Sequence, residues 1–179
     1  MLARLAENMY WAGRYVERAE NTARLLDVTY HGLLESPPAE EATAWRDLLS
    51  VLTLEGEFAS VPRDFTARAV TGFLVADRTN PGSIRSSVGS ARENVRSLRE
   101  EVSTELWEAV NGFYLELDGL DLAGEALRQP YVLYGLVRRQ CQAISGVADE
   151  TMARRDGWRF LVLGRQVERV VMTDRKSVV

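Results

Sequence analysis

Residues 1–34, MLARLAENMYWAGRYVERAENTARLLDVTYHGLL, decide the fold class. Their apolar side chains recur every three or four residues, which at about 100° per residue places them on one face of a helix. The prolines of SPP (36–38) follow this stretch, and proline cannot continue a helix, so we expect one long helix that ends near Glu35. The predicted apolar face consists of Leu5, Met9, Ala12, Val16, Ala19, Ala23 and Leu26.

Six further helices are expected, most of them joined by short connections. Residues 55–64 are predicted to be a connection, with Asp64 as the N-cap of the helix that follows. Asn80 is predicted to cap the next helix, with Pro81 in its first position, where a missing N–H has no cost. No segment shows the alternation of a strand, so the predicted fold is all-α, an antiparallel helical bundle. The expected helices span residues 40–54, 65–76, 83–102, 104–117 (capped by Ser103), 130–154 and from 158 onward.

The segment GRYVERAENTAR (13–24) is nearly repeated as GRQVERVVMTDR (164–175). Both copies keep the spacing G-R-x-V-E-R without a gap. A glycine inside a helix costs about 1 kcal/mol relative to alanine, so the recurrence of Gly13 at Gly164 indicates that another backbone approaches closely. We interpret the repeat as the start of a duplicated second half, near residue 157, whose first helix packs against the original about a pseudo-two-fold axis.

The repeated helices carry the candidate functional site. Arg14, Glu17, Arg18 and Asn21 follow one another at steps of three and four residues, so they share one side of the helix, with Arg24 at its margin. If the two copies meet, Arg14, Glu17, Arg165 and Glu168 form a shared cluster. Such a cluster is either a structural salt-bridge network or a site that binds a carboxylate or phosphate through paired arginines. In the second case four arginines bind the anion, and two glutamates orient these arginines. The arginines are Arg14, Arg18, Arg165 and Arg169, and the glutamates are Glu17 and Glu168.

Composition and charge narrow the class of protein. Of 179 residues, 46% are hydrophobic and 27% charged, an ordinary balance for one globular domain. The net charge of −4 argues against a nucleic-acid partner, and no stretch approaches the roughly 18 apolar residues of a membrane span. A single cysteine, Cys141, allows no intramolecular disulfide, so a cytoplasmic location is expected. Cys141 is expected to be a small buried residue, with a catalytic thiol as the alternative.

Recognisable cofactor and metal motifs are missing from the sequence. Walker and Rossmann glycine loops are absent, and one cysteine with one histidine, His31, cannot form a zinc site. We therefore expect no cofactor and no metal. The alternative is that Glu17, Glu93 and Glu168 converge and ligate magnesium, although the neighbouring arginines favour ion pairing instead.

Several stretches together resemble the alpha-E family, a bacterial family of all-helical proteins of unknown function. They are MLARLAENMYWAGRYVERAENTARLLDV (1–28), FLVADRTNPGSI (73–84), ARENVRSLREEVSTELWEAVN (91–111) and GWRFLVLGRQVER (157–169). The resemblance covers essentially the whole chain, taken as a single domain over 1–179. This chain differs from the family pattern in one respect. Family members are considerably longer, and in them the stretch that corresponds to residues 157–169 opens a second half. The chain is therefore interpreted as a fragment.

The family resemblance implies partners and site residues. Its members are encoded beside, or fused to, a circularly permuted ATP-grasp protein and a transglutaminase-like protease, which implies ATP-dependent peptide synthesis or modification. The leading hypothesis is an accessory or co-catalytic helical partner in such a system. The alternatives are a glutamate-dependent enzyme of amide-bond chemistry, with Glu17, Glu93 and Glu168 as candidate catalytic residues, and a purely structural dimerisation module, which includes a homodimer. The candidate ligand-binding residues are Arg14, Arg18, Asn21, Arg24, Arg92, Asn94, Arg165 and Arg169. The family's motifs also cover Glu20, Asn80 and Ser83.

Overall fold

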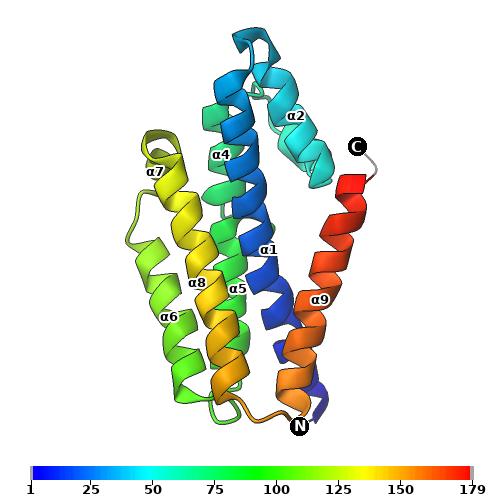
Figure 1. The fold of residues 1–179 in the computed structure, drawn as a ribbon, viewed down its shortest axis with the longest axis vertical. Coiled ribbons are helices and arrows are strands. Elements are labelled where there is room, and N and C mark those ends of the chain that lie inside the picture. The colour runs from blue at the N-terminus through cyan, green and yellow to red at the C-terminus, as the bar shows by residue number, and fades with distance from the viewer. Residues whose placement is uncertain (1, 178–179) are drawn as a thin grey trace.

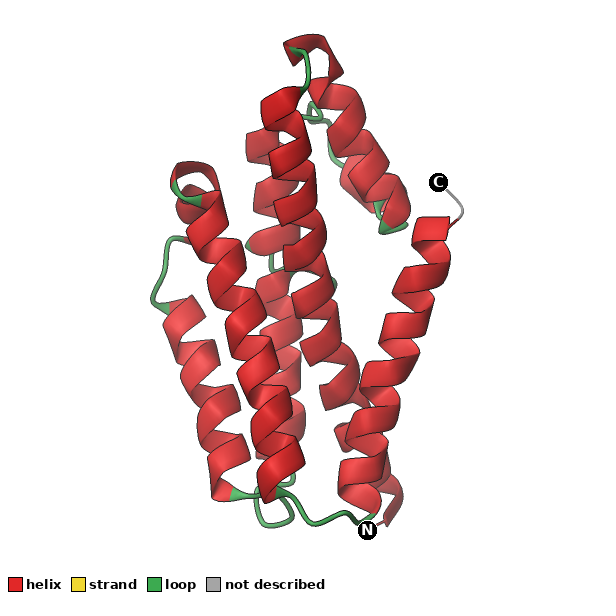
Figure 2. Ribbon diagram, in the orientation of Figure 1, coloured by secondary structure: helices red, strands yellow, loops and turns green. Residues whose placement is uncertain are grey.

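The computed structural model describes residues 2–177, which form helices joined by loops, with no strand in that range (Figure 2). The all-α prediction is confirmed. One long helix, α1, runs most of the length of the molecule, and the others are arranged around it (Figure 1). The α-helices are α1 (Leu2–Glu35), α2 (Glu41–Val51), α3 (Glu55–Ala59), α4 (Ala67–Val75), α5 (Ile84–Arg96), α6 (Thr104–Asp118), α7 (Leu122–Arg128), α8 (Pro130–Thr151) and α9 (Asp156–Ser177), and a 3₁₀ turn, η1, spans Pro38–Glu40.

The apolar face of α1 forms the centre of the core, as the periodicity predicts. Met9, Ala12, Ala19 and Leu26 are completely buried. Small alanines on this face let α5 and α8 pack closely against α1, and both do so. The core continues outward through α6 and α7, which pack against α5, α8 and α4.

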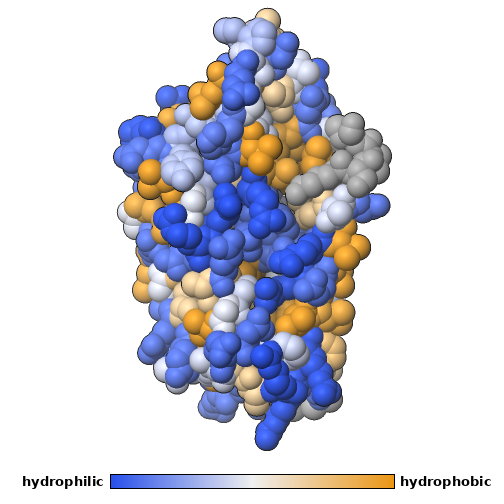
Figure 3. Space-filling view, in the orientation of Figure 1, coloured by the Kyte–Doolittle hydropathy of each residue, from blue (hydrophilic) through white to orange (hydrophobic). Residues whose placement is uncertain are grey.

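Helix α9 is placed differently from the other long helices. It packs chiefly against α1, starts beside the N-terminal end of α1 and runs in the same direction, whereas α8 runs the opposite way (Figure 1). The bundle is therefore antiparallel for α1 and α8 but parallel for α1 and α9. The outer side of α9 exposes Leu163 and Val170, which are 48% and 66% accessible, and hydrophobic residues appear along that edge in Figure 3.

The structure differs from the sequence-based prediction at the connections between helices. Residues 55–64 are not only a connection, because residues 55–59 form α3, whose Phe58 is buried against Phe65 and Phe73. The cap of α4 is Thr66 rather than Asp64, since the Thr66 side chain accepts a hydrogen bond from the N–H of Ala69.

The N-terminus of α5 also differs from expectation. Ser83 caps this helix, and its hydroxyl accepts a hydrogen bond from the N–H of Ser86. Asn80 instead braces the preceding loop: its side chain donates to the carbonyl of Phe73 at 3.0 Å and accepts from the N–H of Gly82 at 2.8 Å. The helix ends at Arg96 rather than near residue 102, because the chain then turns so that Leu98 enters the core.

Candidate functional site

The two glycines of the repeat lie where α1 and α9 touch. A Cβ added to Gly13 would overlap the carbonyl oxygen of Leu161, and a Cβ added to Gly164 would overlap the carbonyl oxygen of Tyr10. The two contacts are reciprocal, because Leu161 and Tyr10 each precede the repeated glycine by three residues. Only a residue without Cβ permits this approach. The close backbone approach inferred from the glycines is confirmed.

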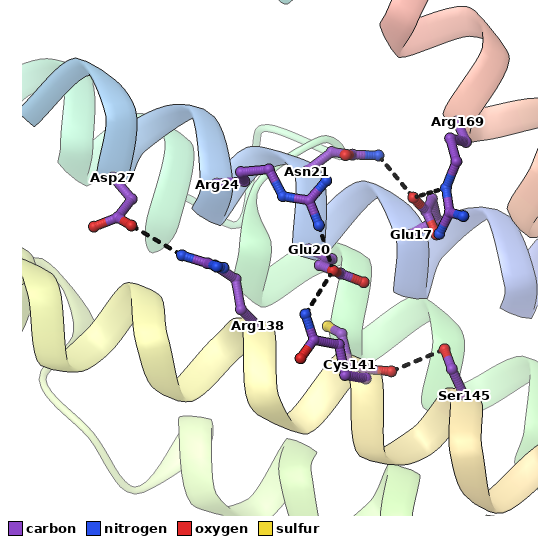
Figure 4. A network of polar contacts seen from close by, with 10 residues as sticks. Glu17, Glu20, Asn21, Arg24, Asp27, Arg138, Cys141, Ser145 and Arg169 are labelled. Carbon is purple, nitrogen blue, oxygen red and sulfur yellow. Dashed lines mark hydrogen bonds and ion pairs between the residues drawn. The ribbon is translucent and has the colours of Figure 1, made fainter.

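One turn beyond the glycines, the two Glu-Arg dipeptides of the chain pair with each other. Arg18 Nε and Nη2 donate to Glu168 Oε1 and Oε2 at 2.8 and 3.1 Å. Arg169 Nε and Nη2 donate to Glu17 Oε1 and Oε2 at 3.0 and 2.9 Å, across from α9 to α1 (Figure 4). Both pairs are bidentate, the strongest geometry for a guanidinium and a carboxylate. The predicted meeting of the two repeated segments is therefore observed, and we call these four residues the Glu-Arg cluster.

Both carboxylates of the Glu-Arg cluster are buried, with residue accessibilities of 1% for Glu17 and 2% for Glu168. Glu168 accepts a further bond from Arg14 Nε, so two guanidinium groups share it. Burial raises the pKa of the Glu168 carboxyl, but the hydrogen bonds and charges of Arg18 and Arg14 outweigh this effect and hold the pKa below its usual value. Glu17 has one arginine and the amide of Asn21, which donates at 3.2 Å.

The arginines on the α1 side also stack on aromatic rings. The Arg14 guanidinium lies 5.5 Å from the centre of the Trp11 ring, and Arg18 lies at the same distance from Tyr15. Arg14 donates to the Tyr10 hydroxyl at 2.7 Å. These contacts fix the guanidinium planes and leave further N–H groups of both arginines without a hydrogen-bond acceptor among residues 2–177.

Two other residues of the predicted site lie outside the Glu-Arg cluster. Arg165 does not reach Glu17, and its nearest carboxylate is Asp149 of α8, at 3.8 Å. Arg24 pairs with Glu20 at 2.6 Å, in a second polar network between α1 and α8 (Figure 4). That network also includes the bond from Gln142 to Glu20 and the ion pair between Arg138 and Asp27.

The candidates on α5 form a separate group. Arg92 donates to Asn111 of α6 and to Glu93, and Glu93 also pairs with Arg96. Asn94 donates to the carbonyl of Ser90, one turn earlier in the same helix. Glu93 therefore does not converge with Glu17 and Glu168. Within residues 2–177 no three acidic, histidine or cysteine side chains are grouped so that they could hold a metal ion.

A small pocket opens beside the Glu-Arg cluster. It has a volume of about 230 Å³, and Arg14, Arg18 and Glu168 form one side of it. The pocket is also lined by residues of α3 and of the loops that precede α3 and α5, which no sequence motif connects with the repeated helices. Those residues are Leu52, Thr53, Leu54, Glu57, Pro81 and Gly82.

The chain has a single cysteine and a single histidine. Cys141 is completely buried, as expected, and burial together with the charges of Glu20 and Glu17 raises the pKa of its thiol well above the usual value. A protonated buried thiol is a poor nucleophile. His31 lies in the last turns of α1, with Nδ1 2.8 Å from the carbonyl oxygen of Asp27.

No helix within residues 2–177 is long and apolar enough to cross a bilayer.

This helical arrangement, with its two reciprocal Glu-Arg pairs, agrees with the comparison with known families. The alpha-E family, described as a predicted alpha-helical domain with a conserved ER motif, matches residues 1–177, and the chain belongs to this family. Uncharacterised proteins of Mycobacterium bovis and Mycobacterium tuberculosis are 28% identical to it over 183 aligned residues. The match covers 93% of this chain and 21% of each relative, so the chain spans about a fifth of their length. No solved structure matches the chain significantly.

Proposed function

We propose that the chain is an accessory helical module of an ATP-grasp-dependent peptide synthesis or modification system, in which Arg14 and Arg18 bind an anionic group. One observation carries the binding part: two guanidinium groups share the single carboxylate of Glu168 at the edge of a pocket. Arg14 and Arg18 together carry one positive charge more than Glu168 neutralises, and both arginines have spare N–H donors. An incoming carboxylate or phosphate oxygen would use both.

The partner part of the proposal rests on the family. The resemblance implies a circularly permuted ATP-grasp protein and a transglutaminase-like protease as partners. The relatives support a modular role, because the matched segment makes up only about a fifth of their length. Co-purification with the ATP-grasp protein, followed by ATP turnover with and without the helical module, tests this part. A homodimer remains a further prediction.

We also propose that α1 and α9 derive from one duplicated helix. Two kinds of contact support this proposal because each has its counterpart: Gly13 contacts α9 as Gly164 contacts α1, and Glu17 pairs with Arg169 as Glu168 pairs with Arg18. The same reciprocity favours a second candidate function, a structural module in which the Glu-Arg cluster only holds the two helices together. The glutamate-dependent enzyme is disfavoured, because both glutamates are paired and the lowered pKa keeps Glu168 ionised.

A titration of small anions separates anion binding from the structural role. Acetate and inorganic phosphate are added to the protein while the Nε–H resonances of Arg14 and Arg18 are followed by NMR. Anion binding predicts saturable shifts at both arginines and a loss of affinity of at least tenfold in Arg18→Gln. The control is Arg24→Gln, since Arg24 pairs with Glu20 outside the pocket. Unshifted resonances with both anions would overturn anion binding and leave the structural role.

A further inference from the structure

A larger pocket lies next to the pocket beside the Glu-Arg cluster. The larger pocket has a volume of about 1070 Å³ and lies between α3, the end of α4 and the loop that precedes α5. The two pockets share four lining residues, Thr53, Leu54, Glu57 and Pro81, so they lie next to each other. Together they form one groove with Arg14 and Arg18 at one end, which we call the α3 groove.

The walls of the α3 groove are held firmly where the two pockets join. Thr53 has φ of 58°, a left-handed conformation that is rare and strained for a β-branched residue. On the other wall, Pro81 follows the buried Asn80, whose side chain is bonded on both sides. The Ser83 hydroxyl donates to the carbonyl of Asp77 at 2.7 Å and closes the loop. The groove is therefore preformed, and a ligand loses little free energy in ordering it.

The chemistry of the groove changes along its length. At the narrow end, Arg14 and Arg18 offer N–H donors. At the junction, Glu57 offers a carboxylate that has no ion-pair partner in the described part of the chain. The wide end combines apolar surface with hydrogen-bonding groups: Leu54, Val61 and Phe73 alternate there with Ser60, Thr79, Asp77 and Arg63.

This order of groups matches the C-terminal end of a peptide. A peptide C-terminus carries a carboxylate that can accept hydrogen bonds from Arg14 and Arg18, and next to it an amide N–H that can donate to the Glu57 carboxylate. A phosphate dianion would bring a second negative charge toward Glu57. A fatty-acid chain would desolvate the polar groups of the wide end without replacing their hydrogen bonds.

Building on the proposed function, we propose that the α3 groove binds the C-terminal segment of a peptide. The terminal carboxylate binds to Arg14 and Arg18, and the preceding residues run over Thr53 and Pro81 into the wide end. A tetrapeptide has one carboxylate to bind at Arg14 and Arg18, and its four residues extend over about 13 Å at about 3.3 Å each. The anion site then serves to hold a peptide end, which is the substrate chemistry of an amide-forming system.

The test compares four probes by NMR titration: acetate, N-acetylalanine, N-acetyl-tetra-alanine with a free carboxylate, and its C-terminal amide. The free tetrapeptide is expected to bind at least tenfold more tightly than N-acetylalanine and at least tenfold more tightly than the amide. Equal affinities for the tetrapeptide and N-acetylalanine, or for the acid and the amide, would overturn the inference. Acetate binding in that case would leave the anion site of the proposed function standing, whereas silence with all four probes would remove both.

A bulky substitution in the wide end locates the peptide. Gly56 lines the larger pocket, and a Cβ there meets no atom within 4 Å, so Gly56→Trp can fill the groove without disturbing the core. It should lower tetrapeptide affinity at least tenfold and leave acetate binding unchanged. Gly32→Trp is the matched control, since Gly32 is equally open but lies outside the groove. Val61→Glu, at an exposed position of the same pocket, gives a second variant with the same expectation. Unchanged tetrapeptide affinity in both groove variants contradicts the proposal.

Discussion

Replacing Gly13 by alanine perturbs the contact between α1 and α9 with a single methyl group. In the present backbone the added Cβ would overlap the carbonyl oxygen of Leu161 and lie 3.0 Å from its carbonyl carbon and 3.1 Å from the N–H nitrogen of Arg165. All three atoms belong to the backbone of α9, so no side chain can rotate to relieve the overlap. The helices must separate until the contact reaches about 3.5 Å, an ordinary van der Waals distance.

The expected magnitude follows from two opposing effects. Forcing an extra methyl into a packed contact costs about 3 kcal/mol. Alanine recovers about 1 kcal/mol through its higher helix propensity. The net result is a protein less stable by about 2 kcal/mol. Separation of the two helices would also lengthen the hydrogen bonds between Arg18 and Glu168, which adds to the loss of stability.

Urea denaturation followed by circular dichroism measures this change, and α1 supplies its own control. Gly32 lies in the same helix, and a Cβ added there meets no atom within 4 Å. Gly32→Ala should therefore stabilise the protein by about 0.5–1 kcal/mol, so the two substitutions have opposite signs. If Gly13→Ala also stabilised the protein, the close approach of α1 and α9 would be refuted.

Three further predictions concern single side chains. Because the pKa of Glu168 is lowered in the folded protein, its ionised carboxylate contributes stability at neutral pH. This stability is lost as the pH falls through about 4.5 toward the folded-state pKa. The urea midpoint of Glu168→Gln should therefore fall less in acid than the midpoint of the wild type. Glu108→Gln, at an exposed position of α6, is the control; a wild-type profile in Glu168→Gln would contradict this. Ser103→Ala should cost about 1 kcal/mol in the same assay, because Ser103 caps α6; no change would show that the cap is dispensable. Cys141 should react with a thiol reagent only on unfolding, and rapid labelling of the native protein would contradict its burial.

The sequence predicts those parts of the fold that depend on local chemistry. The extent of α1 follows from an uninterrupted helical period and the prolines after it, and the cap at Ser103 follows from its side chain. Residues 55–64 were assigned wrongly because α3 is only five residues long and depends on burying Phe58 in the core. Asn80 resembles an N-cap locally, but the loop requires its amide for the carbonyl of Phe73.

The candidate site was predicted in part for the same reason. A repeat is visible in the sequence, so the meeting of the two Glu-Arg dipeptides could be inferred before their contacts were known. The partner of each arginine depends on how α9 is rotated against α1, which the repeat does not determine, and Arg165 consequently turned out to lie near Asp149. The groove is not predictable from the sequence, because Thr53, Glu57 and Pro81 come together only when α3 and two loops meet in the folded chain.

The most direct test of the central claim, that the two Glu-Arg dipeptides join α1 to α9, is a double-mutant cycle on Glu17 and Arg169. The two residues form a one-to-one bidentate pair across the helices. Unfolding free energies are measured by urea denaturation for the wild type, Glu17→Gln, Arg169→Gln and the double variant. The account predicts a coupling free energy of about 2 kcal/mol, because each single change strands a charge that the other change removes. Additivity within about 0.5 kcal/mol would contradict it.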